Sequence, residues 1–140
     1  MKTTTSPNKS ILIIHGPNMT LVGKRYNGIT IDKINRVLKK EATKHAYSLY
    51  IFQTNEEGKA VTLLQRYRNR VKGIILFPGP WQECGHVIKD TLGLLKLPCI
   101  TLSTGEKEKL IKREGHIKDL DLLTGCKISI QKMVKLLNAK

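Results

Sequence analysis

Two loops rich in glycine and proline carry the side chains of this chain that are best suited to chemistry. The first begins at Gly16-Pro17-Asn18 and ends at Arg25-Tyr26. The Asn18 amide can orient a ligand or a water, or it can cap an Asx turn of the loop itself. An arginine beside a tyrosine favours the phenolate, so Tyr26 is a candidate base. The alternative is an ordinary surface pair.

The second loop is Phe77-Pro78-Gly79-Pro80-Trp81, and it follows an apolar run as the first loop does. Such a break after a β-branched run is typical of a buried strand that ends in a ligand-binding loop. Phe77, Gly79 and Trp81 are therefore candidate binding residues. The indole can cover an apolar ligand face or simply shield the loop.

Three ionisable residues flank these loops. His15 precedes the first glycine and can bind an anion or transfer a proton, or it can bond to nearby backbone. Glu83 and Cys84 follow Trp81 at the start of an expected helix. There a carboxylate suits the helix dipole, while a thiol is either activated or simply packed.

Alternating strand and helix patterns must position these residues. Strands are expected at 10–15, 47–53, 73–77, 98–102 and 119–124, and helices at 31–42, 54–67, 82–95, 106–113 and 128–137. Thr30 is the expected N-cap of the first helix. This alternation predicts an α/β fold, a flavodoxin-like, doubly wound, five-stranded parallel sheet of order 2-1-3-4-5 between two helical layers.

In that strand order, the first and third strands are neighbours at the topological switch point, where ligands bind at the carboxyl ends of strands. The two loops leave those ends, so they are expected to border one crevice. Ser103, Thr104 and the backbone of Gly105 follow the fourth strand and are expected to form a third wall that can hold a carboxylate or phosphate.

The chain has 140 residues, 40% of them hydrophobic. We expect a polar tail at 1–9 and one domain at 10–140. No apolar stretch reaches membrane-spanning length and the N-terminus lacks an apolar signal core, so no membrane partner and a cytoplasmic location are expected. Three dispersed cysteines without a CxxC pair favour free thiols and no metal site.

Lysine and arginine number 25 against 11 acidic residues, a net charge of +14. Such a surface attracts small anions and can also bind nucleic acid. The positive charges are spread over several expected helices without interleaved aromatic residues, so a solvated basic surface is favoured over a nucleic-acid site.

Three motifs resemble those of type II 3-dehydroquinate dehydratases. The first runs from Gly16-Pro17-Asn18 through Gly23 to Arg25, the second is the segment 53–58, Gln-Thr-Asn-Glu-Glu-Gly, and the third pairs Pro-Gly at 78–79 with Lys-Asp at 89–90. The resemblance extends over 11–137. It implies a flavodoxin-like fold and a homo-oligomer, a trimer or a dodecamer built from trimers.

The resemblance further implies removal of water from 3-dehydroquinate in the shikimate pathway of aromatic amino acid biosynthesis. The family eliminates water in the anti sense through an enolate, without a metal or organic cofactor. Asn18 matches the family's loop asparagine, Arg25 its catalytic arginine and Tyr26 its tyrosine base. The loop is about four residues shorter than is usual in the family. Asp90 matches an aspartate that reaches a neighbouring subunit.

Other matched positions differ in residue type. Phe77 stands for an asparagine, Glu83 for a substrate-binding histidine, and Ser103 for the histidine acid. Lys112 or Arg113 matches a later arginine only loosely. Serine is not a general acid near neutral pH, and a carboxylate repels an anionic substrate.

Three hypotheses follow. The favoured one is a divergent family member that binds a small anionic ligand with weak or lost dehydratase activity. The second is an active hydro-lyase with Tyr26 as base, in which His15 or His116 replaces the missing acid. The third is a basic protein that binds nucleic acid or another polyanion.

Overall fold

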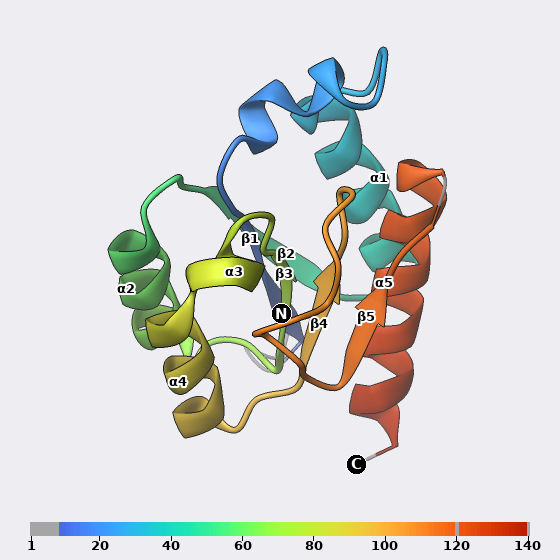
Figure 1. Ribbon diagram of the computed structural model, residues 1–140. Coiled ribbons are helices and arrows are strands. Elements are labelled where there is room, and N and C mark those ends of the chain that lie inside the picture. The colour runs from blue at the N-terminus through green and yellow to red at the C-terminus, as the bar shows by residue number, and fades with distance from the viewer. Residues whose placement is uncertain (1–8, 120, 140) are drawn as a thin grey trace.

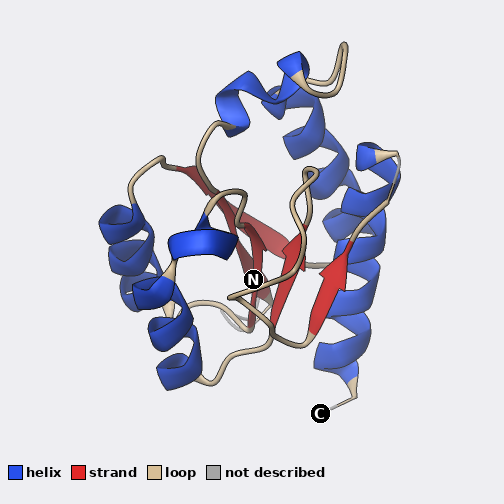
Figure 2. Ribbon diagram, viewed as in Figure 1, coloured by secondary structure: helices blue, strands red, loops and turns tan. Residues whose placement is uncertain are grey.

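The computed structural model describes residues 9–119 and 121–139, and its centre is a five-stranded parallel sheet of order β2-β1-β3-β4-β5 (Figures 1 and 2). The strands are β1 (Ser10–His15), β2 (Ser48–Gln53), β3 (Gly73–Phe77), β4 (Cys99–Leu102) and β5 (Gly115–Ile117). The predicted flavodoxin-like strand order is confirmed. All carboxyl ends of the strands therefore lie along one edge.

Helices cover both faces of the sheet (Figure 1). One face carries α1 (Ile31–Lys44) and α5 (Leu122–Asn138), and the other carries α2 (Glu57–Tyr67), α4 (His86–Leu95) and the short α3 (Trp81–Cys84). Strand β1 is buried throughout because its side chains pack alternately into the helical layers on the two faces of the sheet. Ile11 and Ile13 pack toward α1 and α5, and Leu12 and Ile14 pack toward α2 and α4.

Local sequence signals explain several element boundaries. The Thr30 hydroxyl accepts from the Lys33 N–H (3.1 Å), so the predicted N-cap of α1 is confirmed. The expected helix at 82–95 is interrupted at Gly85, whose backbone is not helical. A Cβ at Gly85 would lie 2.7 Å from the Trp81 carbonyl oxygen, so only glycine fits at this turn without a shift of the backbone. The Glu57 carboxylate then accepts from the first free N–H groups of α4.

The helix predicted at 106–113 does not form. The buried side chain of Gln82 accepts from the N–H groups of Lys109 (3.0 Å) and Ile111 (2.8 Å) and donates to the Ile111 carbonyl (3.1 Å). These bonds hold the segment extended and satisfy groups that a helix would use itself. A tertiary contact therefore overrides the helical propensity of the lysines and glutamates.

The strand predicted at 119–124 is also wrong. Strand β5 lies earlier, at Gly115–Ile117, and Asp121 is the N-cap of α5, with its carboxylate accepting from the Leu123 N–H. Hydrogen bonds to Thr124 and to backbone N–H groups lower the pKa of Asp121. In place of the predicted strand, Asp121 caps a helix whose first residue, Leu122, is buried.

Across the described ranges, 9–119 and 121–139, no helix combines the length and apolarity needed to cross a bilayer. The three cysteines are free: Cys84 is exposed, and Cys99 and Cys126 are buried. Burial raises the pKa of each buried thiol to about 12, which keeps them protonated. Residues 1–8, most of the predicted tail, lie outside the described residues.

Candidate functional site

The two glycine-proline loops meet at the carboxyl edge of the sheet, as predicted. The Gly16 N–H donates to the Phe77 carbonyl (2.9 Å), and a Cβ at Gly16 would lie 2.5 Å from that oxygen. Gly79 has a φ of +50°, and a Cβ there would lie 3.6 Å from the Pro17 carbonyl oxygen. Only glycine allows both the close approach at the first loop and the left-handed turn at the second at low energy.

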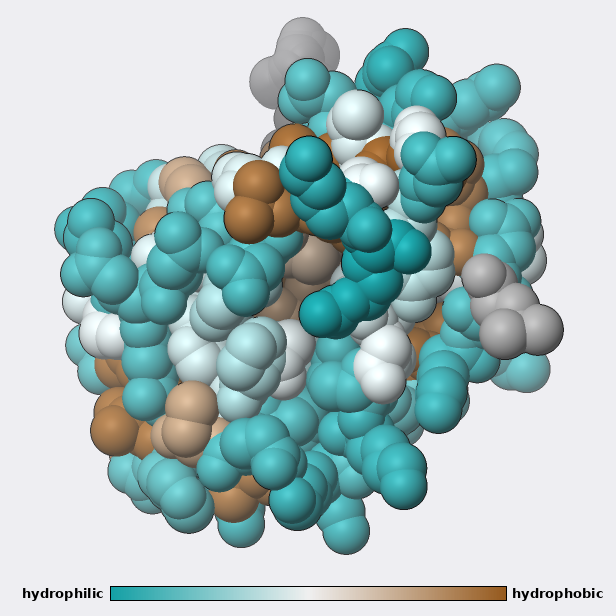
Figure 3. Space-filling model, turned by 45° about the horizontal axis from the view of Figure 1, so that its top comes forward, coloured by the Kyte–Doolittle hydropathy of each residue, from teal (hydrophilic) through white to brown (hydrophobic). Residues whose placement is uncertain are grey.

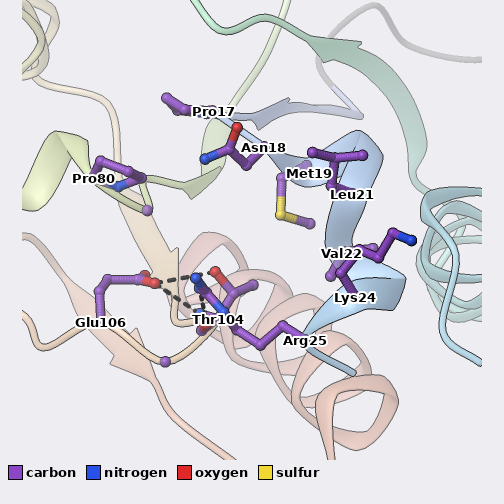
Figure 4. Close-up of a pocket in the computed structure, with 12 residues that line it drawn as sticks. Pro17, Asn18, Met19, Leu21, Val22, Lys24, Arg25, Pro80, Thr104 and Glu106 are labelled. Atoms are coloured by element: carbon purple, nitrogen blue, oxygen red, sulfur yellow. Dashed lines mark hydrogen bonds between the residues drawn. The ribbon is translucent and has the colours of Figure 1, made fainter. Parts of the chain in front are cut away.

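A pocket of about 810 Å³ opens where these loops face the segment after β4. This volume is in the range of small-molecule sites. Twelve residues line it: Pro17, Asn18, Met19, Leu21, Val22, Lys24, Arg25, Gly79, Pro80, Thr104, Gly105 and Glu106 (Figure 4). The third wall predicted after the fourth strand is therefore present. Hydrophilic side chains dominate this end of the molecule, with hydrophobic ones visible between them (Figure 3).

Asn18 is held at the pocket by its backbone. Its φ is 69°, a left-handed conformation that asparagine tolerates better than most residues. Its N–H donates to Asn55 Oδ1 (3.1 Å), an oxygen that also accepts from the Gln53 amide. The loop after β2 thus fixes the loop after β1 and leaves the Asn18 side chain free to face the pocket (Figure 4).

The segment after Asn18 forms the second wall. It is the short 3-10 helix η1 (Met19–Lys24), and Met19 and Val22 turn inward to the core. Arg25 follows, and its guanidinium donates to the Thr104 carbonyl (2.7 Å) across the pocket. Tyr26 does not line the pocket: its half-buried ring packs against the core cluster beneath η1.

Glu106 lies on the opposite wall. One carboxylate oxygen accepts from both the N–H (3.0 Å) and the hydroxyl (3.1 Å) of Thr104 (Figure 4). The other oxygen is buried and has no hydrogen-bond partner. The neighbouring Gly105 N–H donates to Ser103 Oγ (3.0 Å), which itself donates to the Glu106 carbonyl (2.7 Å). The hydrogen-bond donors of the predicted anion-binding segment are therefore satisfied by acceptors within the same segment.

Three residues predicted at the site lie beneath it. His15, Phe77 and Ser103 are buried and do not line the pocket. His15 Nε2 lies 2.7 Å from the Asn35 Oδ1 acceptor, so the ring donates there, while Nδ1 has no partner. Burial lowers the pKa of His15 to about 4, because the charged form loses its hydration. The ring also stacks on Phe77, 4.4 Å between centroids.

The other predicted residues lie outside the pocket. Trp81 is buried against the second core layer, and Glu83 is exposed and pairs with Lys109 (2.8 Å). Arg113 donates to the Leu97 carbonyl just before β4, at the opposite edge of the sheet from the pocket.

Lys112, the neighbour of Arg113, does not line the pocket, and neither does His116. His116 Nδ1 lies 2.6 Å from the hydroxyl of buried Thr101. Asp90 lies on the exposed face of α4, beside Leu94, and borders a separate shallow depression.

Six lining residues were not singled out from the sequence: Met19, Leu21, Val22, Lys24, Pro80 and Glu106. A signal existed for the first three, because Met19, Leu21 and Val22 are apolar residues within an otherwise polar loop. Nothing local identified Glu106, since its place depends on the extended path that Gln82 imposes downstream.

Comparison with known proteins identifies the family. A family model described as dehydroquinase class II matches residues 9–119. The chain belongs to the dehydroquinase class II family. The resemblance that the three motifs indicated is thereby confirmed, and the chain is a type II 3-dehydroquinate dehydratase-like protein.

Individual relatives agree with this family. The chain is 32% identical over 123 residues to a 3-dehydroquinate dehydratase of Thermoanaerobacter pseudethanolicus, covering 85% of this chain and 81% of the relative. It is 37% identical over 94 residues to that of Roseiflexus castenholzii, covering 64% of this chain and 60% of the relative's length.

A solved structure of type II dehydroquinase from Propionibacterium acnes has the same fold. It superposes with a TM-score of 0.78 at 22% identity, over 91% of this chain and 97% of that one. The dehydroquinase fold accounts for the sheet order and for the position of the loops.

Proposed function

We propose that this protein binds a small carboxylate of the 3-dehydroquinate type in the pocket at the carboxyl edge of the sheet, and that its dehydratase turnover is weak or lost. The observation that carries this proposal is the lining of the pocket. The described lining residues that ionise are Lys24, Arg25 and Glu106, and they include no histidine or tyrosine. The two cations attract an anionic ligand, and Asn18 can orient it.

The chemistry of elimination explains the expected loss of rate. Removing water through an enolate requires a base that takes the proton and an acid that protonates the leaving hydroxyl, each worth about 10²–10⁴ in rate. The Tyr26 ring packs on the core. The Ser103 hydroxyl already donates to the Glu106 carbonyl. Neither group is therefore placed to transfer a proton in this conformation.

A second candidate is an active dehydratase, and one observation favours it. Arg25 lines the pocket directly before Tyr26, on the turn that ends η1. A rotation of this turn would bring the phenol beside the guanidinium, which favours the phenolate. Ligand binding is the event that would supply such a rearrangement.

Turnover of 3-dehydroquinate separates the two candidates. The purified protein is mixed with 3-dehydroquinate, the absorbance of the conjugated product is followed, and binding is measured by calorimetry. Binding without turnover supports the first candidate. Turnover that disappears in Tyr26→Phe establishes the second and overturns the first. Absence of binding contradicts both.

We also propose that the protein is a homo-oligomer, with Asp90 at a subunit contact. Asp90 and Leu94 are both exposed on the outer face of α4, and Leu94 (73% exposed) is one of two large apolar side chains exposed on this helix, with Val87. Light scattering should give a trimer or a larger assembly, and Asp90→Ala should shift it toward smaller species. A wild-type monomer would contradict the proposal.

A further inference from the structure

The segment after β4 has the donors of an anion-binding site, and all of them are already engaged. The Thr104 N–H and hydroxyl both donate to Glu106 Oε1, and the Gly105 N–H donates to Ser103 Oγ. Gly105 has a φ of +113°, a backbone conformation that glycine adopts more readily than other residues, so the chain can bend sharply here. Concave runs of N–H groups bind carboxylates and phosphates. Here the carboxylate comes from the chain itself.

The position of Glu106 links this arrangement to the pocket. Glu106, Thr104 and Gly105 all line the pocket, and Arg25 reaches across it to the Thr104 carbonyl. The remaining Glu106 oxygen is buried without a partner, an arrangement that costs free energy unless something compensates for it.

We propose that Glu106 is a built-in carboxylate that occupies the anion-binding position of the pocket and thereby determines which ligands enter. This inference rests on the proposed function, since it concerns the same pocket. A ligand carboxylate must displace Glu106 from the Thr104 donors before it binds there. Ligands that carry a hydroxyl or ammonium donor instead of a carboxylate do not compete with Glu106 for the Thr104 donors.

The competition is unequal because Glu106 is tethered two residues from the donors. A group held on so short a tether acts at an effective concentration of about millimolar or more. The ligand carboxylate is also repelled by the carboxylate that it approaches. Removing the Glu106 carboxylate should therefore strengthen carboxylate binding at least tenfold, although the variant loses a hydrogen-bonding side chain of the pocket.

The first experiment uses acetate as a minimal carboxylate and needs no knowledge of the true ligand. The Thr104 amide resonance is followed by NMR during acetate titration of wild type, Glu106→Ala and Glu106→Gln. Glu108→Ala is the matched control, because it removes the same charge from an exposed residue of the same segment. Glu106→Gln keeps the size of the side chain if Glu106→Ala unfolds the segment.

We expect the Thr104 resonance to shift at tenfold or more lower acetate in the two Glu106 variants than in wild type or Glu108→Ala. Equal titration of wild type and the Glu106 variants overturns the inference. Titration enhanced equally by Glu108→Ala also overturns it, since net charge alone would then explain the effect.

The second experiment repeats the comparison with 3-dehydroquinate by calorimetry. If wild type binds 3-dehydroquinate and Glu106→Gln binds it no more tightly, the inference fails while the proposed function stands. If neither protein binds 3-dehydroquinate but acetate binds better to the Glu106 variants, the proposed function fails while the role of Glu106 stands.

Discussion

The rim of the pocket and the layer directly beneath it differ in how their residues are used. Rim residues such as Asn18 and Arg25 come from loops and keep polar groups at the pocket surface. The layer beneath consists of the last residues of strands or their immediate successors, His15, Phe77 and Ser103, which are buried and bonded or stacked within the protein. Polar residue type alone therefore does not decide which residues meet a ligand.

This difference follows from the geometry of a parallel sheet. A strand covered on both faces points each successive side chain into one helical layer or the other. The last strand residue is no exception, so His15 and Phe77 enter the core and stack on each other. Side chains reach the ligand only after the backbone has turned away at glycine and proline. Perturbing the buried layer should change stability, and perturbing the rim should change binding.

The largest effect is expected at Gly16, where the two loops touch. Gly16→Ala places a methyl group 2.5 Å from the Phe77 carbonyl oxygen, so the backbone must shift. We expect a loss of about 3 kcal/mol in unfolding free energy, the upper range for overpacking. Urea denaturation measures it. Gly58→Ala is the control, since a Cβ there meets nothing within 4 Å, and equal stability of the two variants would contradict the tight junction.

The next effect is a pH dependence of stability at His15. Its pKa is about 4 in the folded protein against 6.5 for the ordinary value, so between these pH values the unfolded chain binds the proton and the folded one does not. Stability therefore falls as pH drops, by about 2 kcal/mol from pH 6.5 to 5 at about 1.4 kcal/mol per unit. The comparison of urea midpoints for wild type and His15→Asn should show this loss only in wild type.

Between pH 5 and 6.5, the carboxylates whose pKa is lowered in the folded protein do not contribute to this change in stability. Hydrogen bonds from Gln131 and Lys44 lower the pKa of Glu41, and a hydrogen bond from Thr124 lowers that of Asp121. Stability gained from such groups is present above their unfolded pKa, near 4, and is lost below it. A wild-type loss confined to below pH 4.5 would show that His15 is not the group responsible.

A smaller effect, on binding and not on folding, is expected at the rim. Arg25→Gln removes a pocket cation and its bond to the Thr104 carbonyl. We expect about tenfold weaker binding of 3-dehydroquinate, since a charge-assisted bond from the guanidinium to the ligand carboxylate would be worth about 1.5 kcal/mol or more. The Arg25 side chain is exposed, so we expect only a small change in the urea midpoint. Lys33→Gln is the control: it removes a charge near the same loop, where Lys33 donates to the Gly28 carbonyl, outside the pocket.

The smallest effect is expected from thiol modification. Cys84 is exposed, whereas burial raises the pKa of Cys99 and Cys126 to about 12. A disulfide reagent should therefore label one thiol per native chain and three after denaturation, without lowering the thermal midpoint. Labelling of two or three thiols in the native protein would show that the hydrophobic core around Cys99 or Cys126 opens.

The strands that were predicted well from the sequence are those whose own residues are mostly apolar. The apolar runs before Gly16 and Pro78 give β1 and β3 at their predicted bounds, because two covered faces demand uninterrupted apolar residues. The helix prediction for 106–113 failed because a distant contact decides this segment: Gln82 holds 109–111 extended. The strand prediction for 119–124 failed for a local reason, since Asp121 is the N-cap of α5 and accepts from the Leu123 N–H.

The pocket was predicted more accurately in its position than in its membership. Strand order and loop chemistry placed it at the switch point, and Pro17, Asn18, Arg25, Gly79 and Thr104 do line it. The spacing of residues did not predict which side chains are buried and which line the pocket. A buried residue at the end of a strand and a pocket residue in the following turn can be neighbours in the sequence.

The side chain of Gln82 connects two loops of the pocket end of the molecule. It joins the start of α3 to 109–111, three residues beyond Glu106, through three hydrogen bonds in addition to the backbone bond from Leu110. Two loops that enter the pocket from neighbouring strands are thereby clamped into one cooperative unit. Amide protons of Lys109, Leu110 and Ile111 should accordingly exchange with deuterium at the rate of α3. Gln82→Ala should speed exchange most at Lys109 and Ile111, because Leu110 keeps its backbone acceptor.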